Sequence, residues 1–197
     1  LRPHTKTHKM PYVARFQLEQ GACGIAVAKV GEAEVMAEKG ISDILIANEI
    51  VGQRKLERLR ELSKRAKVAF GLDTPCQVQE AQRVFAGNDV PAEVLIEIEV
   101  GENRSGIIEE RDFTSLLDEI RGCSDVRFRG IFSHDGNSYG AEDIDECREI
   151  AREAQERTLY FARLAQDRDM PCEVVSYGAT PTLMNNVDIL EGITEVR

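Results

Sequence analysis

The chain has 197 residues, a formal net charge of -10 at pH 7 and 42% hydrophobic residues. This length suffices for one substantial core in a single domain. The acidic balance argues against nucleic acid as a partner, because binding a phosphate backbone requires clustered Lys and Arg. No apolar run approaches the roughly 20 residues that span a bilayer, and the N-terminus lacks the apolar region of a signal peptide. We therefore predict a cytoplasmic protein that binds neither nucleic acid nor membrane.

The cysteines are five in number and widely scattered, and none forms a Cys-x-x-Cys pair. An odd count without paired spacing favours reduced, mostly buried thiols over a disulfide framework or a cysteine metal site. This pattern agrees with a reducing compartment.

Eight short segments rich in β-forming apolar residues alternate with longer amphipathic segments, which is typical of a βα-repeating fold. The run from Val94 to Ile98 is almost continuously apolar, as expected for a parallel strand buried on both faces. In chain order, the predicted strands are Leu1–Lys6, Gly24–Lys29, Asp43–Asn48, Lys67–Asp73, Ala92–Val100, Val126–His134, Cys172–Tyr177 and Gly192–Arg197.

Three of the segments between these strands have the apolar spacing of helices. The first has Leu56, Leu59 and Leu62, the second has Phe113, Leu116, Leu117 and Ile120, and the third runs from Asp143 to Arg168. Asp143 is a candidate N-cap, and Glu146 three residues later would complete a capping box.

Eight strand and helix units predict an α/β fold of the (β/α)8 TIM-type barrel class that occupies residues 1–197. The alternative is a doubly wound sheet, but no Gly-x-Gly-x-x-Gly turn marks its change of strand order. The chain starts without Met inside the first predicted strand and stops on the last one. We therefore expect it to be a fragment of a longer polypeptide.

Active sites of TIM barrels lie at the C-terminal ends of the strands, so the polar residues that end each strand are the candidates. Asn48 and Asp73 also suit the caps of the following helices, and Lys29 also suits a solvated surface position. In chain order, the candidates are Lys6, His8, Lys29, Asn48, Asp73, Arg104, His134 and the segment from Ser176 to Thr180.

The segment from Ser176 to Thr182 has Gly178 and Ala179 before hydroxyl residues and Pro181, which favours the start of a helix. Free N–H groups and hydroxyls at such a turn can bind an anion, although the pattern also fits an ordinary helix start. Phosphate sites in these barrels favour the loops after strands seven and eight. A phosphate here and Lys6 across the barrel mouth match pyridoxal phosphate, whose aldehyde forms a Schiff base with lysine.

Four motifs together resemble the barrel domain of the D-threonine aldolase and D-serine dehydratase family. They are Arg2-Pro-His-Thr-Lys-Thr-His-Lys9, Glu99-Val-Gly-Glu-Asn-Arg-Ser-Gly106, Ser133-His-Asp-Gly-Asn-Ser-Tyr139 and Ser176-Tyr-Gly-Ala-Thr-Pro-Thr182. They occur in the family's order and span nearly the whole chain. The family consists of fold-type III pyridoxal phosphate enzymes whose barrel is related to that of alanine racemase.

The resemblance implies a role for each matched residue. Lys6 would form the Schiff base, whereas Lys9 would be structural, and His4 and His8 would tune or support Lys6. Arg104 would lie near the phenolic oxygen of the cofactor and Tyr139 near its pyridine nitrogen. The resemblance also places Ser176, Gly178, Ala179 and Thr180 at the phosphate and His134 in contact with cofactor or substrate, as a second catalytic residue.

The family's metal is held by a smaller C-terminal β-domain that is missing from this chain. We therefore expect a divalent metal, Zn or Mn, only in the full-length protein, and we assign no metal ligand here. We also expect a homodimer when the protein is full length.

The resemblance implies a lyase that acts on D-configured 3-hydroxy amino acids through Lys6. Either the Cα–Cβ bond breaks, as in an aldolase, or water and ammonia are lost, as in a dehydratase. The segment from Ile46 to Gly52 is more similar to the aldolases, whereas the motifs around Tyr139 and Thr180 are more similar to the dehydratases. The alternatives are an amino-acid racemase and a non-catalytic barrel that binds pyridoxal phosphate.

Overall fold

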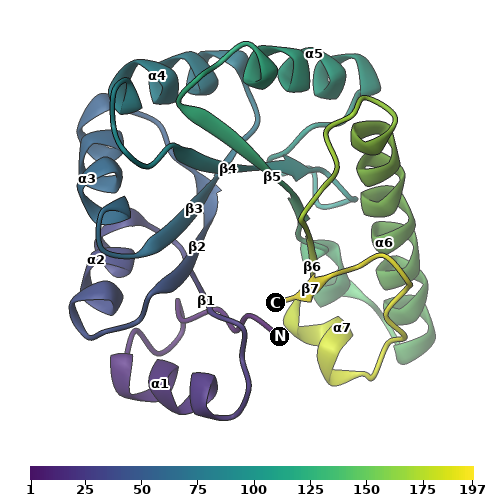
Figure 1. Cartoon of the computed structure of the whole chain (residues 1–197). Helices are drawn as coiled ribbons and strands as arrows, with labels where there is room; N and C mark the ends of the chain where they lie inside the picture. The colour runs from purple at the N-terminus through teal and green to yellow at the C-terminus, as the bar shows by residue number, and fades with distance from the viewer.

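The computed structural model describes residues 1–197, which form one sheet of seven parallel strands surrounded by helices (Figure 1). The strands follow one another in the sheet in chain order, as in a TIM-type barrel. They are β1 (Ile25–Val27), β2 (Asp43–Glu49), β3 (Lys67–Leu72), β4 (Ala92–Ile98), β5 (Val126–Ser133), β6 (Val174–Tyr177) and β7 (Glu195–Val196). The helices are α1 (Pro11–Glu19), α2 (Val30–Glu38), α3 (Gln53–Ser63), α4 (Pro75–Phe85), α5 (Glu110–Arg121), α6 (Ile144–Gln166) and α7 (Thr180–Met184), with a 3-10 turn, η1, at Gly136–Gly140.

The first predicted strand, Leu1–Lys6, is wrong as a regular strand. Only His4 forms an isolated parallel bridge, to Ala26, and a turn begins at Thr5. The reason is Pro3, which has no N–H to donate and therefore interrupts the ladder. The other seven predicted strands are confirmed, with ends that differ by up to three residues.

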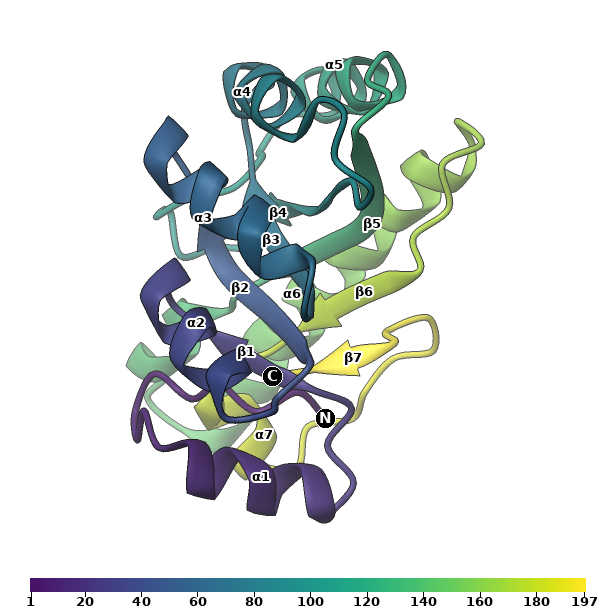
Figure 2. The ribbon, with the colours of Figure 1, turned by 60° about the vertical axis from the view of Figure 1, so that its left-hand side comes forward.

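The N-terminal segment still lies between the first and last strands. The Arg2 N–H donates to the carbonyl of Val196 at 2.8 Å, and the Thr5 N–H donates to the carbonyl of Ala26 at 2.8 Å. The two chain ends are therefore side by side next to β7, as Figures 1 and 2 show. These bonds place Lys6 at the C-terminal end of β1.

The predicted helix start at Asp143 is confirmed. Its side chain accepts the N–H of Glu146 at 2.9 Å, which satisfies one of the free donors of the first turn. The Glu146 carboxylate accepts the N–H of Glu142 instead of that of Asp143, so the expected capping box is only half formed. At α4 the complementary half occurs, since the side chain of Gln77 accepts the N–H of Thr74 at 2.9 Å.

Strand alternation separates two apolar cores. On β2, Ile44 and Ile46 face the helices and belong to a cluster of 39 buried residues, whereas Leu45 faces the barrel axis. A small interior cluster joins Leu45 to Leu95 and Phe132. Burial on both faces explains why these strands are apolar almost throughout.

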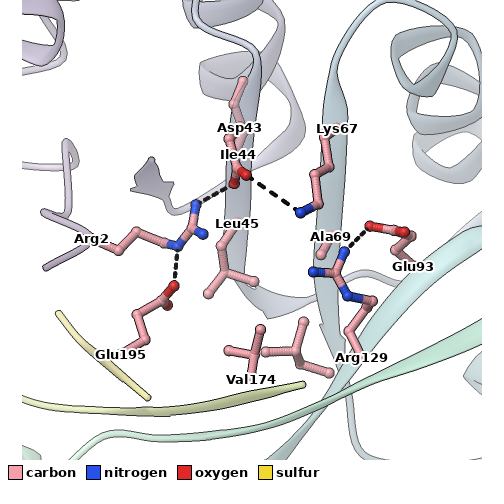
Figure 3. Close-up of a pocket in the computed structure, with 11 residues that line it drawn as sticks. Arg2, Asp43, Ile44, Leu45, Lys67, Ala69, Glu93, Arg129, Val174 and Glu195 are labelled. Carbon is pink, nitrogen blue, oxygen red and sulfur yellow. Dashed lines mark hydrogen bonds and ion pairs between the residues drawn. The ribbon is translucent and has the colours of Figure 1, made fainter. Parts of the chain in front are cut away.

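Below this interior cluster, at the N-terminal ends of the strands, charged side chains form a network that we call the floor (Figure 3). Arg2 donates to Asp43 at 2.6 Å and to Glu195 at 2.6 Å, and the Lys67 ammonium lies 3.6 Å from Asp43. Arg129 pairs with Glu93 in the same way. Only about 20 Å³ of space remains among these side chains.

None of the helices is both long and apolar enough to cross a membrane.

Candidate functional site

The opposite end of the barrel, which we call the mouth, contains a cavity of about 420 Å³. The loops that follow the strands line it, as expected for the active-site end of a TIM barrel. Seven of the eight predicted site residues line this cavity: Lys6, Arg104, His134, Tyr139, Gly178, Ala179 and Thr180. The structure therefore brings together residues up to 174 positions apart in the sequence (180 minus 6).

Lys6 lies in the turn that follows the His4 bridge, and its exposed side chain lines the cavity. Thr5, which is fully buried, holds this turn because its N–H and its hydroxyl both donate to the carbonyl of Ala26. Lys9 has a different surrounding, since its ammonium pairs with Glu32 at 2.6 Å. This pairing agrees with the structural role predicted for Lys9.

His4 also lines the cavity, and its imidazole is neutral. Burial, together with the charges of Lys6 and Arg197, lowers its pKa to about 3. Nδ1 of His4 accepts the backbone N–H of Lys6 at 3.2 Å, so the single ring hydrogen is on Nε2. His8 is not among the lining residues, and its Nδ1 accepts the N–H of Met10 at 3.0 Å.

His134 follows β5 and has the opposite tautomer. Its Nδ1 lies 3.0 Å from the carbonyl oxygen of Gly178, which can only accept, so Nδ1 carries the hydrogen. Burial lowers the pKa of His134, although the Gly178 bond and Glu102 oppose this shift. Nε2 of His134 therefore carries a lone pair and no hydrogen, and the ring remains neutral.

The loop from Gly178 to Thr180 connects β6 to α7. Gly178 has φ +142°, and a Cβ there would lie 2.7 Å from the carbonyl oxygen of Arg197, so only glycine fits without strain. Thr182 fixes the loop through a bond from its hydroxyl to the Ala179 carbonyl at 2.9 Å. Thr180 is the first residue of α7, so its backbone N–H has no hydrogen-bond partner within the helix.

Of the eight residues predicted to contact the cofactor or substrate, only Ser176 does not line the cavity. It is fully buried on β6, where its hydroxyl donates to Glu195 at 2.8 Å and accepts from Arg197 at 2.7 Å. Ser176 therefore contacts the cavity only through Arg197.

Arg197 also lines the cavity, although no sequence motif points to it. Its guanidinium donates to the carbonyl of Ser133 at 2.6 Å and lies over the ring of Phe132, 5.3 Å from the centroid. The signal in the sequence was its place at the end of the eighth predicted strand, because polar residues at the ends of the other strands are the site candidates.

Glu97, a buried carboxyl on β4, is a second lining residue outside the predicted set. Its Oε1 lies 3.7 Å from Nη2 of Arg104, and Nη1 of Arg104 lies 3.3 Å from Glu102. Tyr139, in η1, is 65% exposed with its ring beside the same cavity. The signal for Glu97 was a charge within the otherwise apolar run from Val94 to Ile98.

Three other predicted rim residues, Lys29, Asn48 and Asp73, do not line the cavity. Asn48 donates instead to the carbonyl of Ala28 at 3.1 Å, and the following helix is capped by Thr74 and not by Asp73. The structure contains no group of three or more His, Cys, Asp or Glu side chains that could hold a metal ion.

The alanine racemase N-terminal domain family matches the whole chain, residues 1–197, and the chain belongs to this family. A D-threonine aldolase of Arthrobacter sp. is 32% identical over 180 residues, which cover 91% of this chain and 48% of that protein. The D-threo-3-hydroxyaspartate dehydratase of Delftia sp. strain HT23 is 32% identical over 200 residues, which cover 100% of this chain and 52% of that protein.

A solved structure supports the same relationship. The crystal structure of D-threonine aldolase from Filomicrobium marinum superposes with a TM-score of 0.90 at 32% identity, and it covers all of this chain and 53% of that one. The resemblance inferred from the four motifs is therefore confirmed. The chain spans about half the length of the curated relatives it matches.

Proposed function

We propose that this chain is the pyridoxal phosphate-binding barrel of a lyase that acts on D-configured 3-hydroxy amino acids, with Lys6 as the cofactor's covalent anchor. The observation that carries the proposal is the cavity itself. It combines the ammonium of Lys6, the anion-binding loop at Gly178 and two neutral imidazoles at one barrel mouth. The relatives named as D-threonine aldolase and hydroxyaspartate dehydratase support it.

The residues present fit the cofactor. Thr180, at the start of α7, offers an N–H and a hydroxyl for a phosphate, and its side chain lines the cavity. Arg104 can face the phenolic oxygen, and Tyr139 can face the ring nitrogen. Pyridoxal phosphate, when bound, supplies an aldehyde that joins to amines and a ring that withdraws electrons from the bond to be broken.

The first test replaces Lys6. Lys6→Ala should abolish covalent attachment of pyridoxal phosphate, measured by mass spectrometry after borohydride reduction, together with all turnover. Lys9→Ala is the matched control, since Lys9 is three residues away and pairs with Glu32. Covalent cofactor in the Lys6 variant would show that the anchor has been misassigned.

His134 favours carbon–carbon cleavage over elimination. Aldol cleavage requires a base for the proton of the 3-hydroxyl, and the free lone pair on Nε2 of His134 can accept it. Elimination requires an acid for the departing hydroxyl, and Nε2 of the neutral His134 ring carries no hydrogen to donate. We therefore place the aldolase reaction first and the dehydratase reaction second.

The second test identifies the products. The protein as encoded is incubated with D-threonine and D-serine: glycine with acetaldehyde would support the aldolase, and an oxoacid with ammonia would support the dehydratase. Exchange of the α-proton with loss of chirality would indicate a racemase. Tight binding of pyridoxal phosphate without any product would indicate a non-catalytic barrel.

A divalent metal, Zn or Mn, a homodimeric assembly and a cytoplasmic location remain predictions for the complete protein. Metal analysis of the purified protein and its mass in solution test the first two.

A further inference from the structure

Glu97 is a buried carboxyl at the wall of the mouth. It follows Leu95 by two residues on β4, so strand alternation directs it toward the barrel axis. Only 4% of the residue is exposed, and the Ser105 hydroxyl donates to its Oε2 at 3.0 Å. Its Oε1 lies 3.7 Å from Nη2 of Arg104, so this carboxyl is a neighbour of the arginine expected at the cofactor.

Glu49, the last residue of β2, is the second carboxyl of the pair. Its Oε1 is buried and has no hydrogen-bond partner. Glu49 pairs with Gly71 on β3, and Gly71 pairs with Leu95 on β4, two residues before Glu97, so no side chain at this register separates the two carboxyls. A contact with Glu49 is also one cause of the raised pKa of Glu97. Two ionised carboxylates cannot bond to each other, since each only accepts, so the contact requires a proton between them.

The electrostatic surroundings agree with a shared proton. Burial, together with the contact and charge of Glu49, raises the pKa of Glu97 to about 9, although Ser105 and Arg104 oppose the shift. Asp73, after β3, adds a further carboxyl, and its pKa is raised by burial and by Glu49. The cations that face Glu97 are Arg104 and Arg197.

Two glycines leave the space that the pair requires. A Cβ on Gly106 would lie 3.1 Å from Cγ of Glu97 and 2.8 Å from the backbone nitrogen of Glu99. Gly71 lies on β3, between the strands that carry Glu49 and Glu97, and adds no side chain there. A side chain at Gly106 would therefore press directly on Glu97.

We propose that Glu49 and Glu97 share one proton and together form a positioning pair that orients Arg104 toward the cavity. The role of Arg104 in this proposal rests on the proposed function. With one proton the pair carries a single negative charge, which Arg104, the guanidinium that forms an ion pair with Glu97, can balance. Loss of the proton would double that charge and draw Arg104 toward the barrel wall.

The experiment compares Glu97→Gln, Glu49→Gln and the double variant. Each single variant replaces the shared proton by an amide N–H and keeps one negative charge, so affinity for pyridoxal phosphate should stay within about twofold of wild type. The double variant keeps the shape but removes the charge, and should weaken binding about tenfold. Glu102→Gln is the matched control, because Glu102 contacts the same arginine from a more exposed position.

Two readouts do not depend on turnover. Infrared spectroscopy of the cofactor-free protein at neutral pH should show the C=O stretch of a protonated carboxyl, which disappears as the pH is raised through about 9 and is absent in Glu97→Gln. Fluorescence titration with pyridoxal phosphate should show affinity falling over the same pH range in wild type but not in Glu97→Gln.

Opposite outcomes would overturn the proposal. Absence of a protonated carboxyl in the infrared spectrum would exclude the shared proton, and equal affinity of the double variant and wild type would exclude the positioning of Arg104. If wild type bound no pyridoxal phosphate at any pH, the proposed function and the role of Arg104 would both fail. The infrared measurement would still decide on the shared proton by itself.

Discussion

The floor and the mouth of this barrel are made from similar side chains but have opposite character. At the floor, Arg2 contacts two carboxylates at 2.6 Å each, and about 20 Å³ of space is left (Figure 3). At the mouth, Lys6, Arg104 and His134 line a cavity of about 420 Å³. The charges of the floor pair with one another, whereas the mouth leaves polar groups available for a ligand.

This difference between floor and mouth indicates which residues stabilise the fold and which are available to bind a ligand. Buried groups that satisfy one another hold the strands together, and groups that lack partners cost stability and are retained where a ligand needs them. Changes at the floor should therefore reduce the free energy of unfolding, and changes at the mouth should mainly alter binding or pH dependence.

The largest expected effect comes from Arg2→Ala. It leaves Glu195, whose side chain is 6% exposed, without its cation, and breaking a buried pair in this way costs about 3 kcal/mol or more. Urea denaturation measures the loss. Arg152→Ala, which breaks the exposed pair with Glu156 on α6, should cost about 0.5 kcal/mol or less. Equal losses in the two variants would show that the ion pairs of the floor stabilise the fold no more than an exposed ion pair does.

Gly24→Ala should have the next largest effect. Its Cβ would overlap the guanidinium of Arg2 and lie 2.9 Å from the carbonyl oxygen of Asp43, so the floor must shift. Overpacking of this kind costs about 1 to 3 kcal/mol. Gly140→Ala is the control, since nothing lies within 4 Å of its Cβ position, and its melting temperature should remain near that of wild type. An unchanged melting temperature in the Gly24 variant as well would mean that the floor is loosely packed.

The fold was predictable because the strands are buried on both faces and read as apolar runs. Two elements were not. Pro3 removes the donor that a regular first strand would need, and the pattern of Leu1–Lys6 does not reveal how far one proline interrupts a ladder. Helix α1 buries only Ala14 and exposes Tyr12 by 74% and Phe16 by 56%, so it has no apolar stripe to detect.

The site was predictable where short motifs carry it, as at Lys6 and the loop at Gly178. Arg197 and Glu97 were missed because neither belongs to a motif, and each becomes a site residue only when the barrel directs it to the axis. Ser176 was correctly placed at the end of β6, but the side-chain direction within the strand sends its hydroxyl to Glu195. The direction of a side chain depends on the register in which its strand pairs with its neighbours, and amino-acid composition does not reveal that register.

At the mouth, His4 should make stability depend on pH. Its folded pKa of about 3 lies below the ordinary value of 6.5, so the unfolded chain binds more protons as the pH falls below about 6.5, and the folded state loses stability there. His4→Asn keeps an acceptor for the Lys6 N–H but does not titrate. Between pH 7 and about pH 5.5, wild type should lose about 1 kcal/mol more than the variant, after allowance for partial exposure. Parallel pH profiles from urea denaturation would show that the histidine titrates normally.

Thr180→Ala should have the smallest effect on stability and still affect the ligand. Thr180 is exposed at the first position of α7, and no side-chain hydrogen bond holds its hydroxyl, so the free energy of unfolding should change by less than about 0.5 kcal/mol. If the hydroxyl donates to the phosphate, its loss removes a bond to a charged group and weakens pyridoxal phosphate binding about tenfold. Thr114→Ala on α5, a half-buried threonine outside the cavity, should leave the affinity for pyridoxal phosphate unchanged. Fluorescence titration and urea denaturation of both variants separate the two effects, because a floor-like role would lower stability and a ligand-binding role would lower affinity alone.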